Sequence, residues 1–155
     1  MRFILIDRIL ELDPGKRIIA IKVLPASEEL FRDHFPGFPV VPGVILTEMM
    51  AQAAGRCLDA EGTHPGRAML GKINDAGFRE WVKPGQEIIL HATITQNRPT
   101  YATAECFAEV EGKKVCSAGL FFVFAAYEQL AVGYQDDVLL SYWKAHPSTR
   151  PKTAR

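Results

Sequence analysis

Two residues in the first third of the chain, His34 and Glu48, could form an acid/base pair. Glu48 lies in the most apolar segment of the sequence, where an unpaired carboxylate is costly to bury. Such a group needs hydrogen-bonding partners or a raised pKa that lets it hold a proton near neutral pH. Gln52, four residues on, would share its helical face and could orient the carboxyl group. The alternative is a structural Glu that caps a neighbouring backbone group.

His34 opens the run HFPGFPVVPGV, residues 34–44, which contains three prolines and two glycines. Because proline restricts the backbone, the run predicts a stiff loop that holds the imidazole in place. Histidine can act as a general base near neutral pH, so this position suits a catalytic role. The other three histidines, which we interpret as structural or solvent-exposed, are His64, His91 and His146.

Gly43 follows Pro42 at the predicted start of a helix. Backbone N–H groups in the first turn lack partners within the helix and carry partial positive charge. They could bind an oxygen that gains negative charge in a reaction, and glycine lets a substrate approach the backbone closely. Taken alone, the two residues are more simply explained as a helix-start turn.

One long helix among many strands is the architecture that would position these residues. The helix expected over 43–58 is apolar on every side, which is typical of a buried helix. Apolar residues alternate with polar or larger ones over 87–95 and 101–110, which predicts strands. Further strands are expected at 3–12, 17–24, 67–73 and 114–125, a helical turn at 26–33 and a short helix at 136–145. We therefore expect an α+β fold in which an antiparallel sheet wraps around one buried helix.

Length and composition suit one globular domain. The 155 residues, 48% of them hydrophobic, can bury a core without disulfide bonds or a structural metal. We expect the domain to span residues 1–126, followed by an extension over 127–155 whose basic end is disordered. The 18 basic residues balance the 18 acidic ones, which argues against an electrostatic nucleic-acid binder.

The compartment is predicted from cysteines and apolar runs. Three cysteines without CxxC spacing argue against a disulfide framework or a zinc site and favour a reducing cytosol. The longest apolar stretch, residues 120–126, is too short to cross a bilayer. Asp7 and Arg8 interrupt the N-terminal apolar run too early for a signal peptide. We therefore expect a soluble, cytoplasmic protein.

The stretch HFPGFPVVPGVILTEMMAQAAG, residues 34–55, resembles the signature of 3-hydroxyacyl-(acyl carrier protein) dehydratases, the FabZ/FabA-like enzymes of bacterial fatty-acid synthesis. Residues 7–22 and 78–88 resemble the same family in order and spacing, so the resemblance extends over residues 3–124. The spacing of His34 and Glu48 fits the family, and a Glu rather than an Asp on the helix resembles its dehydratase-only branch.

The resemblance implies a hotdog fold and a homodimer, or a trimer of such dimers, with His34 of one subunit facing Glu48 of the other. The substrate would be a 3-hydroxyacyl chain held as a thioester on the phosphopantetheine of acyl carrier protein, without a metal or separate cofactor. His34 would take the C2 proton, with the Val40 carbonyl orienting its ring. Glu48, oriented by Gln52, would face the C3 hydroxyl, and the Gly43 N–H would stabilise the thioester oxygen. Which group protonates the leaving hydroxyl stays open.

Two further sets of residues are assigned through the resemblance, although core packing and solvation are their simpler explanations. The residues expected along an acyl channel are Phe35, Phe38, Ile45 and Met49, and those expected at the carrier protein are Arg79, Lys83 and Lys72. The chain departs from the family at Gly77, Glu80 and Trp81 and in its C-terminal extension. We interpret these departures as marks of a specialised paralogue in a secondary lipid or polyketide pathway.

Two other functions remain open at this point. A hotdog acyl-thioester hydrolase would also use a carboxylate and a helix N-terminus, but it usually lacks the His-Phe-Pro-Gly run. A non-catalytic acyl-binding subunit has no need for a buried Glu such as Glu48. Both alternatives share the expected fold, so turnover decides between them.

Overall fold

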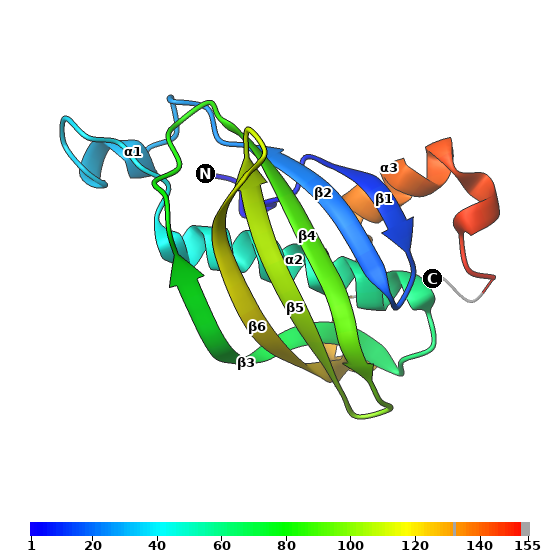
Figure 1. Ribbon diagram of the computed structural model, residues 1–155. Helices are drawn as coiled ribbons and strands as arrows, with labels where there is room; N and C mark the ends of the chain where they lie inside the picture. Colours follow the sequence, from blue (N-terminus) through cyan, green and yellow to red (C-terminus); the bar gives the residue numbers. More distant parts are fainter. Residues whose placement is uncertain (132, 153–155) are drawn as a thin grey trace.

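One six-stranded sheet curves around a long helix in the computed structural model of the chain, which describes residues 1–131 and 133–152 (Figure 1). The helix α2 spans Gly43–Glu61. The strands are β1 (Arg8–Asp13), β2 (Arg17–Val23), β3 (Gly66–Phe78), β4 (Glu87–Asn97), β5 (Tyr101–Val110) and β6 (Lys113–Ala126). They pair antiparallel in the order β1-β2-β4-β5-β6-β3. The predicted α+β hotdog architecture is confirmed.

Small side chains on β5 set how closely the sheet approaches α2. Every second residue of this strand is buried, because successive side chains in a strand point to opposite faces. The buried set includes Ala102, Ala104 and Ala108, and α2 contributes Ala53 and Ala54 to the same core. The concave face of the sheet and α2 therefore pack with little side-chain bulk between their backbones.

The ends of α2 follow local sequence signals. The helix begins directly after Pro42 and ends at Gly62, whose φ of 71° is the left-handed conformation that glycine adopts readily. It is three residues longer than predicted. Val44 corrects the prediction of a helix buried on every side, since this side chain is 74% exposed. Val44 shares its helical face with Glu48, one turn on, and this face points away from the sheet.

Two strands differ in length from the sequence prediction. β1 begins at Arg8 rather than at residue 3, because the backbone at Phe3 and Leu5 bonds to the Gln52 side chain instead of a strand. β3 continues to Phe78, since it pairs with β6 along its whole length. Within the described residues β3 has no partner on its other side, so it forms one edge of the sheet.

This β3 edge carries exposed apolar side chains at Met69, Leu70, Ile73 and Phe78. A long edge strand offers unpaired N–H and C=O groups, and natural proteins usually protect such edges with charges, bulges or cover. An apolar edge of this kind marks a surface that another chain can cover.

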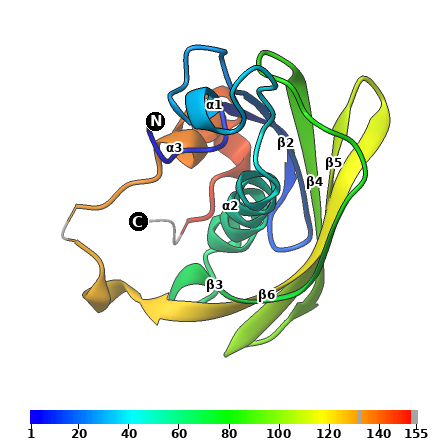
Figure 2. The same ribbon diagram turned by 90° about the vertical axis from the view of Figure 1, so that its left-hand side faces the viewer.

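The chain after β6 returns to the open side of α2. The short 3-10 helix η1 (Tyr127–Gln129) follows β6, and residues 133–136 lead to α3 (Asp137–Ala145), which contacts β1. Figure 2 shows α3 on the side of α2 that faces away from the sheet. The predicted helix over 136–145 is confirmed. A second 3-10 helix, η2 (Pro147–Thr149), begins the predicted disordered tail, whose residues 153–155 lie outside the described part of the chain.

The remaining helix, α1 (Leu30–Asp33), precedes the proline-rich loop and lies beyond the N-terminal end of α2 (Figure 1). It falls within the helical turn predicted over 26–33. No helix in the described ranges is long and apolar enough to span a membrane.

Candidate active site

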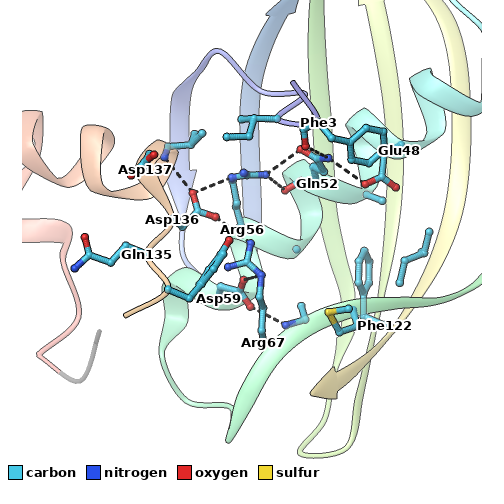
Figure 3. A pocket seen from close by; sticks show the side chains of 18 of the residues that line it. Phe3, Glu48, Gln52, Arg56, Asp59, Arg67, Phe122, Gln135, Asp136 and Asp137 are labelled. Atoms are coloured by element: carbon cyan, nitrogen blue, oxygen red, sulfur yellow. Dashed lines mark hydrogen bonds and ion pairs between the residues drawn. The ribbon is translucent and has the colours of Figure 1, made fainter. Parts of the chain in front are cut away.

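A cavity of about 690 Å³ lies along the face of α2 that the sheet leaves uncovered (Figure 3). One wall is α2 itself, and the others come from the N-terminal residues 2–4, the first half of β3 and residues 134–138 of the C-terminal segment. Glu48 and Gln52 line it from α2. The cavity therefore brings the predicted carboxyl group together with parts of the chain that lie far away in sequence.

Gln52 holds one oxygen of the Glu48 carboxyl group. Its Nε2 donates a hydrogen bond to Glu48 Oε1 at 3.0 Å and a longer one to the Phe3 carbonyl at 3.3 Å. Its Oε1 accepts from the Leu5 N–H at 2.9 Å. Among the described residues the second Glu48 oxygen has no hydrogen-bond partner, so it is available to a bound molecule.

The His34 ring is oriented by the backbone of its own loop. Nδ1 lies 3.2 Å from the Val40 carbonyl oxygen, and the Val40 N–H donates to the His34 carbonyl at 3.0 Å. A carbonyl oxygen only accepts, so Nδ1 carries the proton in this contact. The lone pair is therefore on Nε2, which is the nitrogen that can accept a proton from a substrate.

His34 and Glu48 are not brought together within one chain. His34 is absent from the lining of the cavity that contains Glu48, and the described residues include no hydrogen bond or ion pair between the two. The loop with His34 follows α1 at one end of α2, whereas the cavity extends along the side of α2 (Figures 1 and 3). The expected pairing of His34 with Glu48, and the second chain that it would require, stay predictions.

Gly43 begins α2, and its N–H has no acceptor among the residues that the structure describes. A Cβ at this position would lie 2.9 Å from the Phe78 ring, so packing also favours glycine here. The free N–H and the positive end of the helix dipole provide the electrostatic environment expected for an oxyanion.

The expected acyl-channel residues lie outside the Glu48 cavity of the single chain. Met49 is fully buried in the core, and Ile45 packs against that core. Phe38 is exposed and meets Trp81 edge to face, while Phe35 stacks on the His34 ring. The assignment of these four residues to a channel stays a prediction.

The three basic residues expected at the carrier protein, Arg79, Lys83 and Lys72, are exposed. Within the described part of the chain they form no ion pair, so their charges are free to meet an acidic partner. The described residues also contain no group of three His, Cys, Asp or Glu side chains placed to hold a metal ion.

Comparison with known proteins places the chain in a family. A family model described as a FabA-like domain matches residues 1–119. A Pediococcus pentosaceus protein named 3-hydroxyacyl-(acyl-carrier-protein) dehydratase FabZ is 42% identical over 124 residues, covering 79% of this chain and 83% of the relative. The chain belongs to the 3-hydroxyacyl-(acyl carrier protein) dehydratase family.

Other relatives agree with this family membership. A Listeria innocua protein of the same name is 37% identical over 128 residues, which cover 82% of this chain and 89% of that protein. Among solved structures, a hypothetical thioesterase protein with coenzyme A from Streptococcus pneumoniae has a TM-score of 0.62 at 10% identity, covering 77% of this chain and 85% of the other. At that identity the likeness shows the hotdog fold alone.

Four charged residues around the cavity of this family member were missed by the sequence analysis. They are Arg56, Asp59, Arg67 and Asp136, which form a cluster of ion pairs. One signal was visible, since Glu48, Gln52 and Arg56 recur at every fourth position and therefore share a helical face. Asp136 lies beyond the matched region, 80 positions from Arg56, and only the folded chain brings the two together.

Burial raises the pKa of the Asp59 carboxyl group from its ordinary value near 3.8 to about 6. The hydrogen bond from the Ala68 N–H and the charge of Arg67 oppose this effect but do not cancel it. Because the folded-state pKa is raised, the folded protein binds this proton more tightly than the unfolded chain does. The free energy of unfolding therefore falls as pH rises from about 4 to about 6.

We expect the Asp59→Asn variant to reveal this pH dependence. Asn is neutral at every pH and can still accept from the Ala68 N–H, so it removes the cost of ionising the buried acid. Relative to wild type, the variant should gain about 2 kcal/mol between pH 4 and pH 7. Urea unfolding of both proteins across this range measures the difference. A difference that stays constant or shrinks would mean that the ion pair with Arg67 outweighs burial.

Proposed function

We propose that this chain dehydrates 3-hydroxyacyl thioesters on acyl carrier protein to trans-2-enoyl thioesters in fatty-acid or related lipid or polyketide synthesis. Family membership carries the proposal, because relatives with the dehydratase name match 79% and 82% of this chain. The Glu48 carboxyl group supports it, since Gln52 holds one oxygen and leaves the other facing a cavity.

The proposed chemistry assigns each step to a named atom. His34 Nε2 takes the proton from C2, because Nδ1 is engaged with the Val40 carbonyl. Negative charge then develops on the thioester oxygen, which the Gly43 N–H and the α2 dipole stabilise. The C3–O bond breaks as the C2–C3 double bond forms, and hydroxide leaves as water. The proton for the leaving group comes from Glu48 or, in a syn elimination, from His34.

A homodimer would complete this site. The β3 edge offers unpaired backbone groups and exposed apolar side chains, and pairing it with the same edge of a second copy would cover both. Because the described residues of one chain keep His34 and Glu48 apart, each site would take His34 from one subunit and Glu48 from its partner. A trimer of such dimers is compatible with the same pairing.

The proposed partner is acyl carrier protein, which is acidic. The exposed side chains of Arg79, Lys83 and Lys72 provide positive charge for its docking. The acyl chain would pass Phe35, Phe38 and Ile45 towards Met49, and no metal or separate cofactor takes part.

The three cysteines are free and buried, as is common in proteins of a reducing compartment, which supports a cytoplasmic location.

The deciding experiment follows a 3-hydroxyacyl thioester of acyl carrier protein by mass spectrometry. The dehydratase proposal expects loss of one water and formation of the 2-enoyl thioester, with the carrier still acylated. A saturated acyl thioester on the same carrier is the control for hydrolysis. Release of free thiol from that control would favour an acyl thioesterase. Binding of the hydroxyacyl carrier without turnover would favour a non-catalytic acyl-binding subunit.

A further inference from the structure

A buried ion pair joins the C-terminal segment to α2. Arg56 Nε lies 3.2 Å from Asp136 Oδ1, and the two side chains are only 7% and 8% exposed. The second Asp136 oxygen pairs with Arg67 at 3.1 Å. A buried guanidinium needs a charged partner, because breaking a buried pair leaves an uncompensated charge. Asp136 therefore determines where the Arg56 side chain can lie.

The same Arg56 guanidinium continues towards Glu48. Its Nη1 donates to the Gln52 carbonyl at 3.1 Å and to Gln52 Oε1 at 3.4 Å. A planar guanidinium presents donors in several fixed directions, so one Arg can serve Asp136 and Gln52 at once. Figure 3 shows the resulting series of hydrogen bonds from Asp136 through Arg56 and Gln52 to Glu48.

Arg56 helps to determine which end of the Gln52 amide faces Glu48. The Leu5 N–H and Arg56 are both donors, so the oxygen of the amide must face them. The NH2 group then faces two acceptors, the Phe3 carbonyl and the Glu48 carboxyl group. A flipped amide would place donor against donor and acceptor against acceptor at all four contacts. Gln52 is thereby held in the one orientation that donates to Glu48.

Asp136 is itself fixed by the fold of the C-terminal segment. Its Oδ1 accepts hydrogen bonds from the Val138 and Leu139 N–H groups and so caps the N-terminus of α3. The buried face of α3, which consists of Val138, Leu139, Tyr142 and Trp143, anchors this helix against the rest of the chain. The position of α3 is thus transmitted to the carboxylate that holds Arg56.

We propose that the C-terminal segment positions the catalytic carboxyl group, with Asp136 and Arg56 acting through Gln52 on Glu48. Both residues act through Gln52 in this proposal, so both are positioning residues. The proposal rests on the proposed function, since it needs Glu48 to take part in the dehydration. Asp136 lies beyond residues 1–119, where the family model matches, so this device belongs to the C-terminal segment of this chain.

The first test compares two substitutions of the same chemical kind at a buried and an exposed Asp. Asp136→Asn removes the charge that holds Arg56, and kcat should fall about tenfold with KM within about twofold, as expected for a misplaced catalytic group. Asp13→Asn is the matched control, because that carboxylate is 57% exposed at the end of β1 and does not line the cavity. It should leave kcat within about twofold of wild type. Equal kcat values for the two variants would overturn the proposal.

A second variant covers the case in which Asp136→Asn does not fold. Arg56→Lys keeps a positive charge beside Asp136, but one ammonium nitrogen cannot also reach Gln52 in the guanidinium geometry. This variant should fold, as judged by its melting temperature, and lose about tenfold in kcat. A folded Arg56→Lys variant with wild-type kcat would contradict the proposed role of Arg56.

A double-mutant cycle separates positioning from a general loss of stability. In the Gln52→Ala background the connection to Glu48 is already cut, so adding Arg56→Lys should change kcat by less than about twofold. Its effect on the melting temperature should be the same in both backgrounds. Independent, multiplying losses of kcat would show that Arg56 does not act through Gln52.

Parallel measurement of Glu48→Gln distinguishes failure of the proposed function from failure of the proposed positioning role. If this variant keeps wild-type kcat, the role of Glu48 in the proposed function is wrong and the positioning role is wrong with it. If Glu48→Gln is inactive while Asp136→Asn and Arg56→Lys behave like Asp13→Asn, only the positioning role is overturned. Inactive Glu48→Gln together with the intermediate losses described above is the expected result.

Discussion

Mixing two inactive variants should restore activity. His34→Ala and Glu48→Gln should each lower kcat by at least about a hundredfold, because each removes a group proposed to transfer protons. If each site takes one of these residues from each subunit, a mixed dimer contains one doubly damaged site and one intact site. Random reassociation makes half the dimers mixed, so the mixture should recover about a quarter of wild-type activity.

The mixture is made by unfolding and refolding the two variants together, and dehydration is followed by mass spectrometry. Each variant refolded alone is the control, and native mass spectrometry confirms that mixed dimers have formed. Mixed dimers without recovered activity would contradict a site shared between subunits. Full wild-type activity of either variant alone would remove that residue from the proposed chemistry.

Ile73→Lys should abolish the dimer and, with it, most of the activity. Ile73 is 47% exposed on the β3 edge, so a lysine there costs the single chain little. In a two-fold symmetric interface, the lysine introduced in one subunit lies close to the same lysine of the other subunit. Both ammonium groups then lose contact with water. A monomer contains His34 and Glu48 without their partner groups, and kcat/KM should fall at least about a hundredfold, as when a general acid or base is lost.

Analytical ultracentrifugation and the dehydration assay test this prediction at the same protein concentration. Thr93→Lys is the matched control, because Thr93 is an exposed residue of β4, which lies between β2 and β5 rather than at the edge. That variant should remain dimeric and active. An Ile73→Lys monomer with wild-type activity would show that one chain is sufficient for catalysis.

Local patterns predicted most of the fold. The alternation over 101–110 correctly indicated β5, and Pro42 correctly marked the start of α2, because both signals depend on neighbouring residues alone. The start of β1 was wrong by five residues for the opposite reason. The Leu5 N–H bonds to Gln52, 47 positions along the chain, and no local pattern contains that contact.

The same distinction applies to the candidate site. One continuous stretch of sequence indicated His34, Glu48 and Gln52. In the structure the Gln52 amide donates a hydrogen bond to the Glu48 carboxyl group. Arg56 and Asp136 were missed, because an ion pair across 80 positions depends on how the C-terminal segment folds back. The pairing of His34 with Glu48 across two subunits, which the resemblance implies, stays a prediction, because a single chain cannot display it.

The hydrogen bonds between the Gln52 side chain and the backbone of Phe3 and Leu5 have a practical consequence for protein production. A purification tag fused ahead of Arg2 and Phe3 would lie close to the amide that holds Glu48. Rate constants measured with such a tag in place would include its disturbance of the amide. Kinetic work therefore calls for a tag that is cleaved before the assay, or for one placed elsewhere.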